Sequence, residues 1–254
     1  MAAKKTRVVR LLLGPGYAGD GEVARFSVSG KIPVQVSGNV RSGKCLVFST
    51  GFAGSRTDYG ALCRIFEPDH LVVRVAHPGF GRWAGLKALL WFLGLRVQGK
   101  KAVEAALRVR RWIHSEENYL CRRGQLLRVV DEISRRYRVR AFSLAGHSYG
   151  TDTALRGALE IDVEDLYLFS PHPPGYLVPA NDYAGLRAGV VWVVTGTRDR
   201  TRDGVGPEER LKVAEVCEAR VINLTGVRHM DFAFAELGPE GWVEELVARF
   251  TRRD

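Results

Sequence analysis

The stretch Ala145-Gly-His-Ser-Tyr-Gly-Thr151 decides how the whole chain is interpreted. Its Gly146, Ser148 and Gly150 form a G-x-S-x-G pattern, which follows an apolar, strand-like run and precedes a helix-compatible run. A tight turn between a strand and a helix forces its central residue into a strained backbone conformation that exposes the serine Oγ. A side chain at either glycine would collide with the adjoining strand or helix. The stretch therefore predicts a serine nucleophile, with a plain surface turn as the alternative.

Around this turn, short apolar runs alternate with helix-compatible segments from about Cys45 onward. The alternation predicts an α/β fold with a mostly parallel central sheet of about eight strands and helices on both faces. An antiparallel hairpin is expected at the N-terminal edge, across Ser29-Gly30-Lys31. The expected strands are 8–13, 22–29, 32–36, 45–49, 71–76, 139–145, 163–169, 189–195 and 220–224, and the expected helices are 57–66, 102–113, 119–137, 153–160, 207–217 and 239–252.

The length of 254 residues fits one large α/β domain, and no internal repeat or linker divides the chain. We therefore expect residues 1–254 to form a single domain. Residues 83–117 are its least regular part, because glycines interrupt the apolar spacing.

The chain is basic, since 38 Lys and Arg against 28 Asp and Glu give a net charge of +10. Such a surface can attract nucleic acid, an anionic membrane or an acidic substrate. The excess is spread along the sequence and no nucleic-acid-binding motif accompanies it, so we expect a solubilising surface and no nucleic-acid partner. Most arginines between 108 and 140, Arg122 among them, are expected on solvated helix faces, with an anion-binding stripe as the alternative.

The cysteines point to a reducing compartment. Cys45, Cys63, Cys121 and Cys217 are widely spaced, and no C-x-x-C or Cys/His metal-binding spacing exists. Buried, reduced thiols are the default for such a set. The N-terminal segment is too short in apolar residues for a signal peptide, and no run approaches the ~20 apolar residues of a membrane span. We expect a cytoplasmic protein with no integral membrane segment and no metal.

A serine nucleophile needs a base, which in turn needs an orienting acid. In parallel sheets, functional groups lie in loops beyond the carboxyl ends of strands. His77, His172 and His229 all follow expected strands, so position alone leaves three candidate bases. His147 adjoins the serine but should point away from its Oγ, and His114 is expected on an exposed helix.

The acid should follow a strand as well. Asp199 does so, after the β-branched run 189–195, and Asp203 four residues later is the reserve candidate. An aspartate in a turn or at a helix N-cap is a common structural feature, so Asp199 alone is not decisive.

Taken together, these motifs resemble the α/β-hydrolase family from about Lys44 to the C-terminus. The chain order Ser148, Asp199, His229 matches the serine, acid, histidine order of that family. F-S-T-G-F-A-G-S resembles the oxyanion turn of the family, with Thr50 where histidine is usual. The backbone N–H donors of that turn do not depend on the side chain at Thr50.

The resemblance implies roles for individual residues. Ser148 would attack an acyl carbon, His229 would accept its proton, and Asp199 would hold the imidazole tautomer. The backbone N–H groups of Tyr149 and Phe52, in preference to that of Ala53, would form the oxyanion hole. An acyl-enzyme would form and water would resolve it, with no metal or organic cofactor.

The family commonly has a lid over the serine. Here the excursion 170–187 is short, and the longer insertion, at about 82–118, is the candidate helical cap. Trp83 and Trp91 within it are candidate contacts for the acyl group of a substrate, with packing into the core as the alternative.

The expected activity is a serine hydrolase of the carboxylesterase or lipase type, acting on a small acyl substrate. Acyltransferase, thioesterase and perhydrolase activities on the same fold remain open. So do a catalytically silent binding module and a basic protein that binds anions or nucleic acid.

Overall fold

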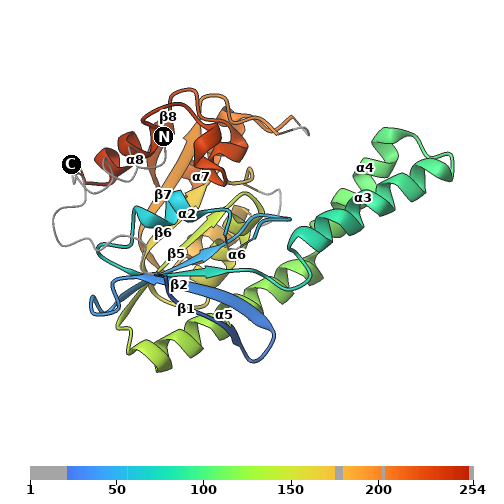
Figure 1. The fold of residues 1–254 in the computed structure, drawn as a ribbon. Helices are drawn as coiled ribbons and strands as arrows, with labels where there is room; N and C mark the ends of the chain where they lie inside the picture. The colour runs from blue at the N-terminus through green and yellow to red at the C-terminus, as the bar shows by residue number, and fades with distance from the viewer. Residues whose placement is uncertain (1–21, 56, 175–179, 202–203, 252–254) are drawn as a thin grey trace.

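The computed structural model describes residues 22–55, 57–174, 180–201 and 204–251. Its centre is a twisted sheet of eight strands in the order β1-β2-β4-β3-β5-β6-β7-β8 (Figure 1). The expected strand at 8–13 and the N-terminal segment lie outside the described residues. The sheet confirms the α/β class, with the strand number and the antiparallel edge that the sequence predicts.

The antiparallel edge consists of β1 (Glu22–Val28) and β2 (Ile32–Gly38), joined by a tight turn. Ser29 and Gly30 in this turn both have positive φ, at 49° and 67°. β2 also pairs antiparallel with β4 (Leu71–Val75), which begins the parallel part of the sheet.

All remaining strand pairs are parallel. These strands are β3 (Lys44–Ser49), β5 (Ala141–His147), β6 (Val163–Phe169), β7 (Ala188–Gly196) and β8 (Arg220–Leu224). The strand order reverses at β3, which has β4 on one side and β5 on the other. In open α/β sheets, ligands bind at the carboxyl ends of strands beside such a reversal.

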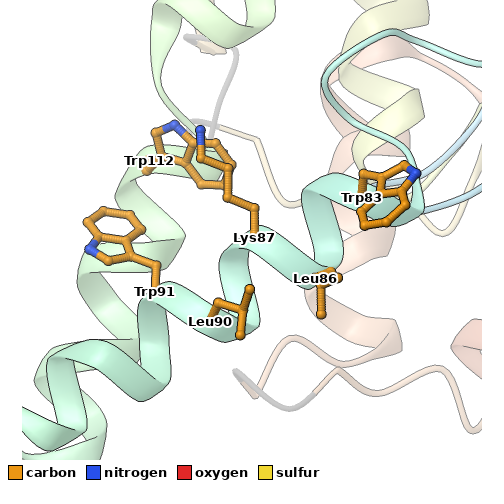
Figure 2. Close-up of a pocket in the computed structure, with 6 residues that line it drawn as sticks. All are labelled: Trp83, Leu86, Lys87, Leu90, Trp91 and Trp112. Atoms are coloured by element: carbon orange, nitrogen blue, oxygen red, sulfur yellow. The ribbon is translucent and has the colours of Figure 1, made fainter.

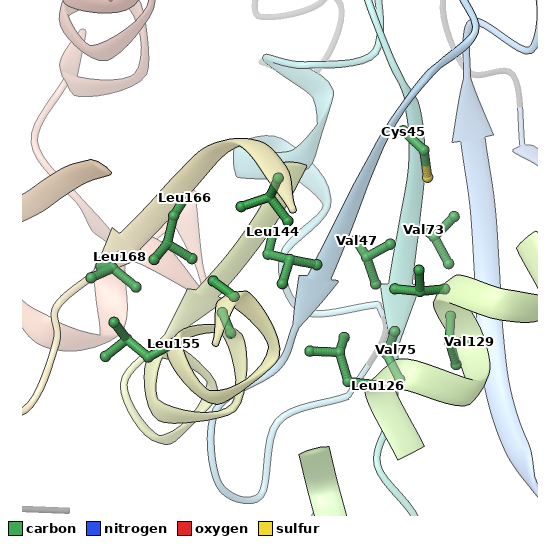
Figure 3. Close-up of a cluster of buried hydrophobic side chains, with 14 of the residues drawn as sticks. Cys45, Val47, Val73, Val75, Leu126, Val129, Leu144, Leu155, Leu166 and Leu168 are labelled. Carbon is green, nitrogen blue, oxygen red and sulfur yellow. The ribbon is translucent and has the colours of Figure 1, made fainter. Parts of the chain in front are cut away.

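Helices α5 (Glu116–Tyr137), α6 (Tyr149–Ala158) and α7 (Pro207–Cys217) cover one face of the sheet. Figure 3 shows the apolar cluster beneath them, in which Val47 and Leu144 of the strands meet Leu126 of α5. α2 (Gly60–Arg64) and α8 (Trp242–Thr251) cover the opposite face. Neighbours along one strand alternate between the two clusters, because strand side chains alternate in direction.

Residues 82–97 are more regular than the sequence pattern indicated, and the helix expected at 102–113 is present with those bounds. α3 (Arg82–Val97) and α4 (Ala102–Ile113) form an antiparallel helical hairpin, and α5 follows after a short turn. The hairpin extends away from the α/β body as a long arm (Figure 1). Gly94 lies inside α3, so it does not interrupt the helix as expected. The helical content of the proposed cap is therefore present, and its role as a cover stays a prediction.

The remaining elements of the described residues are short 3₁₀ turns, one before β7 and two after β8. They are η1 (Ala180–Gly185), η2 (His229–Phe232) and η3 (Ala235–Leu237). The four cysteines are all free thiols. Cys45 and Cys63 are buried as expected, whereas Cys121 is exposed, because its position on α5 faces away from the sheet.

Candidate active site

Ser148 occupies a sharp turn between β5 and α6. Its φ of 53° and ψ of −122° are strained values for a residue with a side chain. The glycines on either side make the turn possible: a Cβ at Gly146 would collide with the carbonyl of Gly150, and one at Gly150 would collide with the carbonyl of Ser49. The Ser148 N–H donates to the Phe169 carbonyl at 3.0 Å, which ties the turn to β6. Ser148 itself is only half-buried.

Three side chains predicted from the sequence come together at this turn. His229 Nε2 lies 3.0 Å from Ser148 Oγ, and His229 Nδ1 lies 3.0 Å from Asp199 Oδ1. Asp199 is fully buried, while the His229 side chain is 14% exposed. The geometry therefore runs from the Ser148 hydroxyl through an imidazole to a buried carboxylate.

The loops that hold the acid and the histidine are packed against each other. The Arg198 N–H donates to the Val227 carbonyl at 3.1 Å, and the Gly226 N–H donates to Thr197 Oγ1 at 2.8 Å. A Cβ at Gly196 would collide with the Val227 carbonyl. The close approach fixes the separation of the loops that follow β7 and β8.

Three further side chains, which were not predicted from the sequence, hold Asp199 in place. One is Thr195, whose Oγ1 donates to Asp199 Oδ2 at 3.2 Å. Ser170 Oγ donates to Asp199 Oδ2 and lies 2.8 Å from His229 Nδ1. Arg210 of α7, fully buried, lies with its Nε 3.2 Å from Asp199 Oδ1 and donates to the carbonyls of Ser170 and Pro171. Every oxygen of the buried carboxylate thus has a partner.

The groups around the Asp199 carboxylate determine its pKa. Burial alone would raise it, but the hydrogen bond from His229 and the positive charge of Arg210 outweigh burial and bring the pKa to about 2. The carboxylate is therefore ionised near neutral pH.

Ser170 left a weak signal in the sequence, because it directly follows a buried strand. Arg210 left none, because an arginine within the run Pro207-Glu-Glu-Arg-Leu211 has the pattern of a solvated helix surface. Only the packing of α7 against β7 turns this side chain inward.

His147 supports the histidine loop without touching Ser148 Oγ. Its Nε2 lies 2.9 Å from the His229 carbonyl, and its Nδ1 lies 3.0 Å from the Tyr59 hydroxyl. Burial lowers the pKa of His147 well below its ordinary value, so the ring is neutral. We assign Nε2 as the donor to the carbonyl, which leaves Nδ1 to accept from Tyr59. These contacts agree with the expectation that His147 points away from the Ser148 Oγ.

The glycine-rich loop after β3 lies against the start of α6. The Phe52 and Tyr149 rings meet edge to face at 6.2 Å. The Ala53 N–H already donates to the Phe80 carbonyl at 2.8 Å, and Ala53 is held at a φ of 61°. Tyr149 is the first residue of α6, where an N–H has no acceptor within the helix. The N–H groups of Phe52 and Tyr149 thus remain the candidate donors.

A buried arginine anchors the same loop. Arg122 of α5 is fully buried, although the sequence pattern suggested a solvated helix face. Its guanidinium donates to the Thr50 carbonyl at 2.5 Å and to Ser49 Oγ at 3.1 Å, and it stacks 4.3 Å from the Tyr149 ring centroid. Burial lowers the pKa of Arg122 to about 10, which still leaves it charged near neutrality.

The other two candidate bases have different partners. His77 Nε2 lies 2.8 Å from Ser49 Oγ, and burial lowers its pKa well below the ordinary value. His172 Nδ1 lies 2.8 Å from the buried Asp152 carboxylate. His114 caps α4, half-buried, with its Nδ1 2.7 Å from the hydroxyl of Tyr119, so it does not lie on an exposed helix as expected.

Trp83 and Trp91 do not fill the core, since their side chains are 83% and 41% exposed. They line an open groove formed by α3 and by Trp112 of α4 (Figure 2). None of the three residues of the serine site lines this groove. Contact of Trp83 and Trp91 with an acyl group stays a prediction, and the reserve acid, Asp203, lies outside the described residues.

Two properties of the described residues bear on other kinds of site. No group of three or more His, Cys, Asp or Glu side chains among them is arranged to hold a metal ion. No helix in the described part of the chain has the length and apolar character to cross a membrane.

No protein-family model and no curated protein sequence matches this chain. Solved structures do. XC6422 from Xanthomonas campestris, an α/β serine hydrolase without a lid, is 16% identical with a TM-score of 0.59, over 95% of this chain and 100% of that one. Est1E from Butyrivibrio proteoclasticus is 14% identical with a TM-score of 0.59, over 91% and 97%.

The Pyrococcus furiosus esterase Pf2001 is a third example, 15% identical with a TM-score of 0.59, over 90% of this chain and 91% of the other. Likeness at this level of identity concerns the arrangement of the backbone. It shows that the chain has the α/β-hydrolase fold.

Proposed function

We propose, from the premise that this chain has the α/β-hydrolase fold, that it is a serine hydrolase that cleaves carboxylic esters through an acyl-enzyme. Ser148 is the nucleophile, His229 the general base and Asp199 the orienting acid. The observation on which the proposal depends is the continuous hydrogen-bonded chain of these three side chains, with 3.0 Å at each step.

In the first step, Ser148 Oγ attacks the acyl carbon while its proton moves to His229 Nε2. For this transfer Nε2 must be unprotonated, so the ring proton is on Nδ1, where it faces Asp199 Oδ1 and Ser170 Oγ. The ionised carboxylate stabilises the imidazolium that results. The imidazolium then protonates the leaving alcohol, and a water molecule resolves the acyl-enzyme by the same transfers in reverse.

The negative charge that develops on the acyl oxygen needs donors that are already in place. We assign this role to the Phe52 and Tyr149 N–H groups. The position of Tyr149 at the positive end of α6 adds the helix dipole. Loss of one such donor typically reduces turnover by ~10²–10³.

The test is labelling with a fluorophosphonate together with hydrolysis of p-nitrophenyl butyrate. We expect the wild-type protein to be labelled and active, and Ser148→Ala to lose the label and at least about 10⁴-fold in turnover. Ser134→Ala, on α5 outside the site, is the control and should match the wild type. Equal labelling of wild type and Ser148→Ala would exclude Ser148 as the nucleophile.

The acyl acceptor is a separate question. A thioesterase, acyltransferase or perhydrolase would form the same acyl-enzyme, and a silent binding module would form none. Ester, thioester and amide substrates, each with water, an alcohol or peroxide as acceptor, separate these activities when they are assayed on the unlabelled wild-type enzyme.

A further inference from the structure

One face of α3 is apolar and open to solvent. Trp83, Leu86, Leu90, Leu93 and Val97, which we call the outer face, recur at three- and four-residue spacing, and all five side chains are exposed, up to 89% for Val97. At 100° per residue they lie within an arc of about 80° on the helix surface. The opposite side of α3 packs against α4 through a small cluster of its own. An exposed apolar surface of this kind is typical of an interaction site.

Basic residues border the outer face. On the helical wheel, Lys87 lies just beyond one edge and Arg96 beyond the other, and α3 has no acidic residue. Residues 82–113 contain eight Lys and Arg against one Glu, a net charge of +7 out of +10 for the chain. That Glu104 is already paired with Lys100 at 3.3 Å and Arg108 at 3.1 Å. The arm thus concentrates the positive charge that the sequence had suggested was spread evenly.

Figure 2 shows how aromatic and cationic groups meet on the arm. Trp83, Leu90 and Trp91 project from α3 around an open groove of about 610 Å³, and Lys87 Nζ lies 5.4 Å from the ring centroid of Trp112. Trp side chains favour the boundary between lipid tails and water. Lysine can leave its alkyl stem among apolar groups while its ammonium reaches phosphate.

We propose that the outer face of the α3–α4 hairpin docks on the surface of an anionic lipid bilayer. The helix would lie in the plane of the interface, with its apolar arc among the upper acyl segments and its flanking cations at the lipid phosphates. α3 has 16 residues and is therefore shorter than the ~20 that a membrane span requires, so it rests on the bilayer without crossing it.

Charge favours an anionic lipid bilayer over a second copy of the chain as the partner of the outer face. Two copies that met through their arms would bring a net charge of +7 against +7. Anionic phospholipid supplies the opposite charge, and its flat surface can contact the whole outer face at once. The proposal does not depend on the activity of the serine site.

The test is co-sedimentation with unilamellar vesicles of phosphatidylcholine alone or with one-third phosphatidylserine, read out by the bound fraction and by tryptophan emission. We expect binding to the anionic vesicles, a blue shift of the emission, and weaker binding in high salt. Leu86→Ser/Leu90→Ser should reduce the partition coefficient by at least about tenfold. Lys87→Gln should reduce it about fivefold.

The matched control is Leu120→Ser/Leu237→Ser, which removes two exposed leucines outside the arm and should bind as the wild type does. Equal binding by the wild type and by Leu86→Ser/Leu90→Ser, which we call the arm variant, would overturn the proposal. So would a wild-type protein that binds neither kind of vesicle. Light scattering completes the test: a wild-type dimer that becomes a monomer in the arm variant, without vesicle binding, would assign the face to a second copy.

Discussion

The substitution Asp199→Asn probes the candidate site at its most buried point. Asparagine has nearly the shape of aspartate but no charge, and its amide can donate to His229 Nδ1. The imidazole proton would then move to Nε2, opposite Ser148 Oγ, where no base remains to accept the serine proton. We expect turnover of p-nitrophenyl butyrate to fall by about 10³–10⁴-fold, as for other triads in which the tautomer is inverted.

The same substitution has a second, independent consequence for stability. The pKa of Asp199 falls from an ordinary 3.8 to about 2 on folding, which corresponds to about 2 kcal/mol. Because the folded pKa is the lower one, this contribution is present above pH ~4 and is lost as the pH falls towards 2. The asparagine variant has no such titration. Between pH 5 and pH 2 the wild type should therefore lose about 2 kcal/mol more of its unfolding free energy than the variant does.

Urea denaturation at both pH values measures this difference, and circular dichroism checks that the variant is folded before activity is compared. Asp203→Asn is the matched control and should keep wild-type activity. The reasoning fails if Asp203→Asn loses the activity instead, or if wild type and Asp199→Asn lose the same free energy on acidification.

Three further substitutions test the supports of the site. Gly150→Ala should leave no soluble active protein, or cost more than about 3 kcal/mol by urea denaturation, because its Cβ would collide with the Ser49 carbonyl; wild-type stability would contradict this. Arg122→Met should lower kcat about 10–100-fold with little change in KM, because the oxyanion loop loses charged hydrogen bonds; steady-state kinetics that show a pure KM effect would count against that role. Arg210→Lys should lower the unfolding free energy by about 1–3 kcal/mol, since an ammonium cannot reproduce the fork that meets Asp199 and two carbonyls; thermal unfolding at wild-type temperature would refute it.

Local patterns predicted much of this fold because they report on single elements. The strand Val163–Phe169 and the helix Pro207–Cys217 match their expected bounds. The strand is a buried apolar run, and the helix starts with proline at its first turn. α4 also matches its expected bounds, 102–113, whereas α3 was not predicted as one continuous helix. α3 is apolar on its packed side and on its outer face, so periodicity could not separate inside from outside.

The candidate triad was within reach of the sequence, since each member follows a strand in a fixed order. The side chains that hold the triad in place could not be predicted from the sequence. Arg122 and Arg210 have the pattern of surface arginines and are completely buried. A charge can be buried only where distant groups compensate it, and these groups are brought together by packing between elements.

The sequence by itself determined the alternation of strands and helices, the strained turn at Ser148, and the candidates for base and acid, because these depend on short-range sterics and on the direction of the chain. Only the tertiary structure decided that His229, of three candidate histidines, contacts Ser148, and that two buried arginines brace the loops on either side. It also decided that the apolar residues of α3 face solvent. The physical reason is that contacts between distant segments depend on which surfaces meet in space, which local periodicity does not encode.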